Sequence, residues 1–182
     1  RKPYFIPGGG SNEIGALGYV CCAFELLDQF KAQMLDVGWI VLASGSAGTH
    51  AGLLAGLHAA HSNIPVLGIS VRQPKERQTN AVYALARDTA AHLIDMPLGI
   101  ELVQVDDGYV GDGYGLPTKG TVRAIDLAAK FEGLLLDPVY SAKGFDGMVS
   151  LIQNGFFEAD KDVVFIHTGG SAALFAYETE LV

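Results

Sequence analysis

The stretch "WIVLASGSAGTHAGL", Trp39 to Leu53, decides the fold of this 182-residue chain. Its first six residues are a near-continuous apolar run, which is typical of a strand buried on both faces of a parallel sheet. Small and hydroxyl-bearing residues follow at once, and a helical pattern covers 48–60. This order predicts a strand–loop–helix unit whose glycine-rich loop lies at the carboxyl end of the strand.

The rest of the chain repeats this alternation. Strands are predicted at 3–7, 39–44, 66–71 and 162–168, and helices at 15–33, 48–60, 75–94, 118–131 and 143–155. The alternation predicts an α/β fold with right-handed crossovers, in which helices flank a mostly parallel sheet in three layers.

Glycine-rich segments follow three of the predicted strands, at 8–12, 44–49 and 167–171. Parallel strands would bring all three to one edge of the sheet, which predicts a ligand site there. The stretch "DDGYVGDGYGLPTKG" (106–120) has no periodicity and is expected to be a loop with a functional role.

Composition narrows the classes of partner. The chain is 49% hydrophobic and 18% charged with a net charge of −8, which favours a packed domain and disfavours nucleic acid or anionic membranes as partners. No apolar run reaches the roughly 18 residues of a membrane helix, and no secretory leader is recognisable. The adjacent Cys21 and Cys22 are expected to be reduced and buried, which predicts a cytoplasmic protein. The five histidines lack ligand spacing, so no metal site is predicted.

The loop after the second predicted strand has the chemistry of an anion cup. Backbone N–H groups at the start of a helix point at a neighbouring anion, and Ser46 and Thr49 add hydroxyl donors. The lysine of a nucleotide-triphosphate loop is absent, and the glycines do not follow the G-x-G-x-x-G dinucleotide spacing. A phosphate monoester is therefore the predicted ligand, and an ordinary turn capped by Thr49 is the alternative.

A serine hydrolase is a second alternative. "SGSAG" differs by one residue from the G-x-S-x-G elbow, with Ser46 as the nucleophile. Asp137 and His167 follow in the order expected of α/β-hydrolases.

Five motifs, taken together, resemble one enzyme class. They are "GGGSNEIGALGY", "ASGSAGTHAGL", "GDGYGLP", "LLLDPVYSAKG" and "FIHTGGSAALFAY". In order and spacing they resemble the pyridoxal-phosphate enzymes of the tryptophan-synthase β class (fold type II). The similarity is to the branch of D-cysteine desulfhydrase, L-cysteate sulfo-lyase and 1-aminocyclopropane-1-carboxylate deaminase.

The resemblance implies roles for single residues. The phosphate of pyridoxal 5′-phosphate would be held by Gly45, Ser46, Ala47, Gly48 and Thr49. Tyr114 and Tyr140 match the active-site tyrosines, which can steer a substrate group or relay a proton.

Two further residues are assigned to cofactor binding. Thr168 matches a position that faces the pyridine nitrogen, and Ser141 follows the tyrosine of the "DPVY" motif. Because the cyclopropane deaminases carry a glutamate where Ser141 stands, this departure argues against opening of a cyclopropane ring.

The resemblance implies a lyase that expels sulfide from D-cysteine or sulfite from L-cysteate and leaves pyruvate and ammonia. Its alternatives are a cyclopropane-carboxylate deaminase, a non-catalytic cofactor-binding half and the hydrolase using Ser46. The family's Schiff-base lysine lies in an "NK" motif that is absent here, and Lys143 comes nearest without matching it. Residues 1–182 are therefore expected to be the carboxyl-terminal part of a lyase that acts on a small amino acid. The expected assembly is a homodimer with the missing amino-terminal portion.

Overall fold

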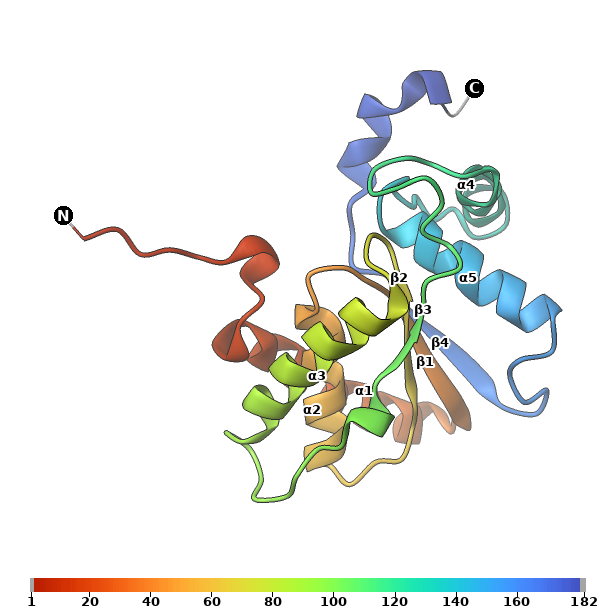
Figure 1. Cartoon of the computed structure of the whole chain (residues 1–182). Helices are drawn as coiled ribbons and strands as arrows, with labels where there is room; N and C mark the ends of the chain where they lie inside the picture. Colours follow the sequence, from red (N-terminus) through yellow and green to blue (C-terminus); the bar gives the residue numbers. More distant parts are fainter. Residues whose placement is uncertain (1, 181–182) are drawn as a thin grey trace.

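The computed structural model describes residues 2–180 as one α/β unit (Figure 1). The strands are β1 (Val37–Ser44), β2 (Val66–Ser70), β3 (Gln104–Asp106) and β4 (Asp162–Ile166). The α-helices are α1 (Glu13–Gln33), α2 (Gly48–Ala59), α3 (Lys75–Ala90), α4 (Lys119–Glu132) and α5 (Ser141–Gln153). Short 3-10 turns are η1 (Gly8–Gly10), η2 (Ile100–Leu102), η3 (Ser171–Ala176) and η4 (Glu178–Glu180).

The sheet has the order β3-β2-β1-β4, and every pair of neighbours is parallel. Side chains of β1 alternate between the two faces. Ile40 and Leu42 join the core under α1, α2 and α3, whereas Val41 joins the core with β2 and α5 on the other face. The predicted three-layer parallel architecture is confirmed, with α1 to α3 on one face and α4 and α5 on the other (Figure 1).

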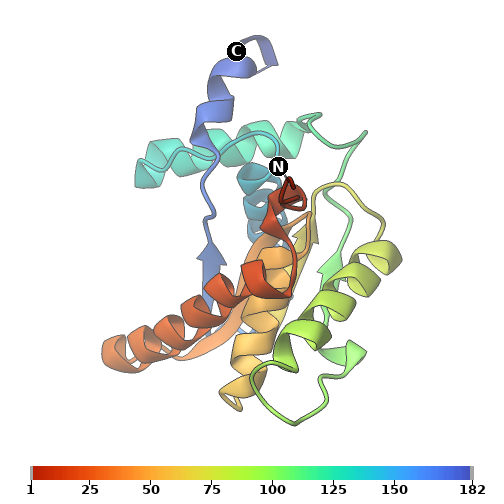
Figure 2. The same ribbon diagram turned by 90° about the vertical axis from the view of Figure 1, so that its left-hand side faces the viewer.

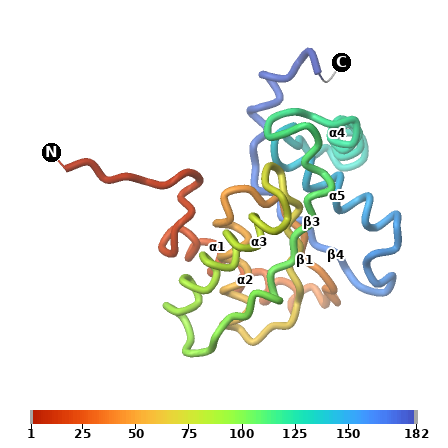
Figure 3. Tube along the Cα trace, viewed as in Figure 1, coloured from red at the N-terminus to blue at the C-terminus, as the bar shows by residue number. Residues whose placement is uncertain are grey.

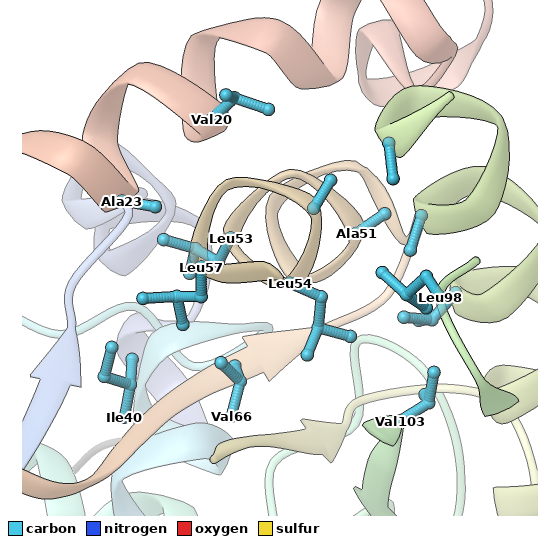
Figure 4. Packing of buried hydrophobic residues seen from close by; sticks show 14 of the residues in the cluster. Val20, Ala23, Ile40, Ala51, Leu53, Leu54, Leu57, Val66, Leu98 and Val103 are labelled. Atoms are coloured by element: carbon cyan, nitrogen blue, oxygen red, sulfur yellow. The ribbon is translucent and has the colours of Figure 1, made fainter. Parts of the chain in front are cut away.

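Helix α2 is the central helix of the first layer. Its leucines 53, 54 and 57 face the sheet, and α1 crosses on its opposite side (Figure 4). Gly52 and Gly56 allow this close crossing, because a Cβ at either position would collide with α1. A helix covered on all sides is apolar all round, which explains the lack of a polar stripe in its sequence.

Two strand predictions need correction. Residues 3–7 form no strand: Tyr4, Phe5 and Ile6 are exposed, and the segment extends away from the body (Figure 3). Pro3 and Pro7 lack the N–H that a strand ladder requires. Strand β3 was not predicted because its three residues, "QVD", are too short to show an apolar pattern.

The other elements begin and end within a few residues of their predicted bounds. The largest difference is that α3 ends at Ala90 instead of residue 94. Cys21 and Cys22 are free, as predicted, but Cys21 is exposed and Cys22 is half-buried, so their predicted burial is wrong. Among the described residues, no helix is long and apolar enough to cross a membrane.

The carboxyl ends of the strands all lie at one edge, and α4 crosses near this edge (Figure 2). The loops after β1 and β4 are there, as predicted. The segment 8–12 reaches the same edge without a preceding strand, because it packs on the loop after β1.

Candidate functional site

A small hollow lies where β1 ends and α2 begins. It is lined by Ala43, Ser44, Gly45, Ser46, Ala47, Gly48, Thr49, His50, Tyr140 and Thr168. The structure thus brings together all five residues of the predicted phosphate cup, one of the two predicted tyrosines and the predicted threonine. A larger hollow of about 330 Å³ lies at the opposite edge of the sheet, between His58 and Glu101, away from the glycine-rich loops.

The backbone of the cup presents free donors. Ala47 adopts a left-handed conformation (φ 75°) and is the N-cap of α2, and no described side chain caps this helix end. The first helical bond runs from Ala51 N to Ala47 O, so the N–H groups of the first turn have no helical partner. The alternative in which Thr49 caps the helix is therefore wrong, and an uncapped, electropositive helix end faces the hollow.

Ser46 is held by the segment that precedes α1. Ser11 Oγ donates to Ser46 Oγ at 2.9 Å, which leaves the Ser46 proton free to be donated. The two loops fit closely, because a Cβ at Gly9 would collide with Ser46 and a Cβ at Gly48 would collide with Ser11. Sequence reasoning did not assign Ser11, since only the packing of the two loops reveals this contact.

Tyr140 closes the cup from the other side. Its hydroxyl lies against Gly45, where a Cβ would collide with it. Burial raises the pKa of Tyr140 to about 12, Tyr114 adds to this rise, and Arg72 opposes it. The phenol is therefore neutral at physiological pH and faces the cup as a hydrogen-bond donor.

Asp137 positions Tyr140 at the start of α5. Its carboxylate accepts hydrogen bonds from the amides of Val139, Tyr140 and Ser141 at 2.8–2.9 Å, and from Ser141 Oγ at 2.6 Å. Ser141, assigned to the cofactor by the resemblance, is buried, bonds to Asp137 and does not line the hollow.

This arrangement contradicts the hydrolase alternative. Asp137 is committed to the turn before α5, and its described hydrogen bonds do not include His167. Gly169 N donates to His167 Nδ1 at 3.0 Å, so Nε2 carries the proton and donates to Leu135 O at 3.2 Å. No Ser–His–Asp relay forms around Ser46 among residues 2–180.

Tyr114 does not line the hollow but packs on Tyr140. Their rings meet edge to face, with centroids 5.8 Å apart and an interplanar angle of 85°. Tyr114 itself is half exposed at the carboxyl edge of the sheet.

Lys143 holds the loop that carries Tyr114. Its side chain is fully buried, and Nζ donates to Val110 O at 2.6 Å and Gly113 O at 2.8 Å. Burial lowers the pKa of this amine. A lysine between Ala142 and Gly144 in an apolar helical pattern was the signal in the sequence, but its partners are visible only in the fold.

A buried polar group lies beneath the cup. Gln78 Nε2 donates to Ser44 Oγ at 2.9 Å, and Ser44 Oγ shares a hydrogen bond with His50 Nδ1 at 3.2 Å. Burial lowers the pKa of His50 to about 4, and the Val66 carbonyl opposes this in part. These contacts tie the end of β1 to the first turn of α2 and to α3.

The residues present fit a phosphate monoester. Uncapped amides and the free Ser46 proton supply donors for the phosphate, and Gly45 leaves room under Tyr140. Thr168, exposed after β4, lines the same hollow and offers a neutral hydroxyl.

The chain is similar in sequence to known enzymes. The chain is 40% identical over 180 residues to a D-cysteine desulfhydrase of Yersinia enterocolitica. The matched residues are 99% of this chain and 54% of that protein. A D-cysteine desulfhydrase of Salmonella typhi is 41% identical over 177 residues, which is 97% of this chain and 53% of that protein. The chain thus spans about half the length of the curated relatives it matches.

Solved structures show the same fold. A crystal structure of an ACC deaminase homologue superposes with a TM-score of 0.88 at 36% identity, over 100% of this chain and 53% of that one. A threonine deaminase from T.th. shares the fold alone, with a TM-score of 0.52 at 15% identity over 82% of this chain and 56% of that one.

The family model described as "Pyridoxal-phosphate dependent enzyme" matches residues 1–169, which include the whole cup and Tyr140. The chain therefore belongs to the pyridoxal-phosphate dependent enzymes.

Proposed function

We propose that this chain supplies two parts of a lyase that removes a sulfur group from a three-carbon amino acid. They are the phosphate cup (Gly45 to Thr49) and the tyrosine wall (Tyr114 and Tyr140). One observation carries the proposal: the uncapped start of α2, the free proton of Ser46 and the neutral phenol of Tyr140 converge on one hollow. The D-cysteine desulfhydrases among its relatives support a sulfur amino acid as the substrate.

Pyridoxal phosphate, when bound, withdraws electrons from the α-carbon of an amino acid, so that a β-substituent can leave. The residues of the cup would hold its phosphate, with the amides of the first α2 turn and Ser46 Oγ as the donors. Thr168 would supply a neutral hydroxyl to the ring nitrogen, as the resemblance implies. Ser141 acts through Asp137, which fixes the turn that presents Tyr140.

The tyrosines act on the substrate side. The Tyr140 phenol donates a hydrogen bond to an anionic or carbonyl oxygen, because its raised pKa keeps it protonated across the neutral range. Tyr114 holds the Tyr140 ring in place through its edge-to-face contact. The lysine that binds the cofactor covalently would come from outside these 182 residues, since no described lysine lines the hollow.

We also propose where the protein is located in the cell and how it assembles. Two free cysteines, one of them exposed, suit a reducing compartment, and we place the protein in the cytoplasm. A homodimer that includes the amino-terminal portion is the expected assembly, which light scattering of the purified protein would test.

The test is product analysis with added pyridoxal phosphate. The complete enzyme should release pyruvate with sulfide from D-cysteine or with sulfite from L-cysteate, and the cofactor should show visible absorbance. Release of a four-carbon keto acid from 1-aminocyclopropane-1-carboxylate would instead support the deaminase, which the ACC deaminase homologue keeps as the second candidate. Cofactor absorbance without any product would support a non-catalytic half.

A further inference from the structure

Arg72 lies beside the tyrosine wall, outside the cup. It follows β2 by two residues, at the carboxyl edge of the sheet, and its guanidinium carbon is 5.7 Å from the centroid of the Tyr114 ring. Its charge lowers the pKa of Tyr140 against the larger effects of burial and Tyr114.

The backbone of Arg72 is fixed while its side chain is available. Ser70 Oγ donates to Gln73 O at 2.6 Å and accepts from Gln73 N at 3.2 Å, which closes a turn around Arg72. The side chain is exposed. The three ion pairs in residues 2–180 are Arg87–Asp88, Lys130–Asp126 and Lys161–Asp36, so no described carboxylate neutralises Arg72.

An unpaired arginine next to an active-site tyrosine, in a chain of net charge −8, has a chemical use. A guanidinium presents planar paired donors that match the oxygens of a carboxylate, phosphate or sulfonate. A thiol offers no such oxygens. The cation therefore distinguishes substrates that carry an oxyanion on the β-carbon from those that carry a thiol.

We infer that Arg72 is a specificity-determining residue that binds an anionic β-substituent of the sulfonate class. The inference rests on the proposed lyase function and deepens it. In the reaction, a general base takes the Cα proton, the electron pair of the Cα–H bond forms the Cα–Cβ double bond, and the Cβ–S bond breaks with its electron pair leaving on sulfur as sulfite. Arg72 stabilises the charge on the sulfonate oxygens before and during this departure.

The kinetic test compares two substrates in the complete, cofactor-loaded enzyme. Arg72→Met should lower kcat/KM for L-cysteate by about 10- to 100-fold, the usual effect of losing a charge-assisted hydrogen bond, and D-cysteine should change less than about 3-fold. Arg72→Lys should recover part of the lost kcat/KM, because a lysine keeps the positive charge but lacks the planar paired donors of the guanidinium. Arg77→Met, an exposed arginine in the first turn of α3 with no described contact to either tyrosine, is the matched control and should leave both substrates unchanged.

Equal losses on both substrates would overturn the inference, since they would assign Arg72 to the α-carboxylate or to structure. No loss on either would overturn it as well. In either case pyruvate release by the wild type would leave the proposed function standing.

A binding test separates the two proposals. Calorimetry with 3-sulfopropanoate, an unreactive sulfonate, should show about 10-fold weaker binding for Arg72→Met than for the wild type and for Arg77→Met. If the wild type releases pyruvate from neither substrate, the proposed function fails, and this titration alone decides the role of Arg72. Identical affinity in all three proteins would refute it.

Discussion

Gly45 has no Cβ, and the hydroxyl of Tyr140 occupies the space where a Cβ would lie. Ser46 next to it accepts from Ser11 and so keeps its own proton free. The identity of the cup residues was predictable, because glycines and hydroxyls after a buried strand are a local pattern. The contributions of Ser11 and Arg72 were not, because they arise from loops that meet only in the fold.

Gly45→Ala should weaken pyridoxal-phosphate binding by about 10- to 100-fold, because the added methyl pushes Tyr140 out of the cup at a cost of roughly 1–3 kcal/mol. Titration of the cofactor by its visible absorbance measures the change. Gly18→Ala is the control: it lies on the exposed face of α1 with open space around it, and should leave binding unchanged and the helix slightly more stable. Wild-type affinity in Gly45→Ala would show that the cup is not used.

His50 makes folding depend on pH. Its pKa is about 4 in the folded chain and near 6.5 when unfolded, so the unfolded state binds more protons between these values. Its contribution to stability is complete above about pH 6.5 and is lost as the pH falls toward 4. A shift of this size corresponds to roughly 3 kcal/mol.

Urea unfolding at a series of pH values between 8 and 4 measures this loss. His50→Asn should remove that part of the pH dependence, whatever its effect on stability at pH 8. His92→Gln, which changes an exposed histidine, should retain it. If the unfolding free energy of His50→Asn depends on pH as steeply as that of the wild type, the acid sensitivity belongs to other groups.

At the scale of elements, the apolar patterns were sufficient for the five α-helices and for β1, β2 and β4, since each buries apolar side chains in one of the cores of the fold. They were insufficient for β3, whose three residues pair with β2 for reasons that its composition does not reveal. They misled at 3–7, where an apolar segment has no neighbouring strand in the described chain. The loop 107–118 was recognised, but the contact from α5 that holds it was not.

Lys143→Met should loosen that loop without unfolding the domain. Two charged hydrogen bonds to Val110 O and Gly113 O are lost, while the methionine chain still fills the buried space. We expect faster amide exchange in 107–118, a weaker near-ultraviolet tyrosine signal and a loss of about 1–3 kcal/mol in unfolding free energy. Lys130→Met, which removes only an exposed ion pair with Asp126, should change stability by less than about 1 kcal/mol. Unchanged exchange in the loop of Lys143→Met would contradict the positioning role.

At the scale of the whole molecule, the sheet collects its polar loops at one edge, and the lysine side chains of the described residues do not line the cup formed there. The described lysines other than Lys143 lie on helices, in loops or in the extended segment, and none lines the cup. Lys143 is closest in sequence to Tyr140, but its amine is engaged with two backbone carbonyls. In the proposed function, the described residues would therefore anchor a phosphate without offering a nucleophilic amine to the carbonyl of the cofactor.

This separation predicts that the 182-residue chain binds pyridoxal phosphate reversibly and does not eliminate sulfide or sulfite by itself. Borohydride reduction of the loaded chain followed by intact mass measurement should give no stoichiometric pyridoxyl adduct, and dialysis should remove the cofactor. A second sample with Gly45→Ala should retain still less cofactor, which ties the binding to the cup. A single adduct on Lys143 would contradict the prediction, because it would require the amine to leave Val110 and Gly113 and reach the hollow. Pyruvate release by the chain alone would contradict it equally, since turnover of this class depends on a lysine bound to the cofactor.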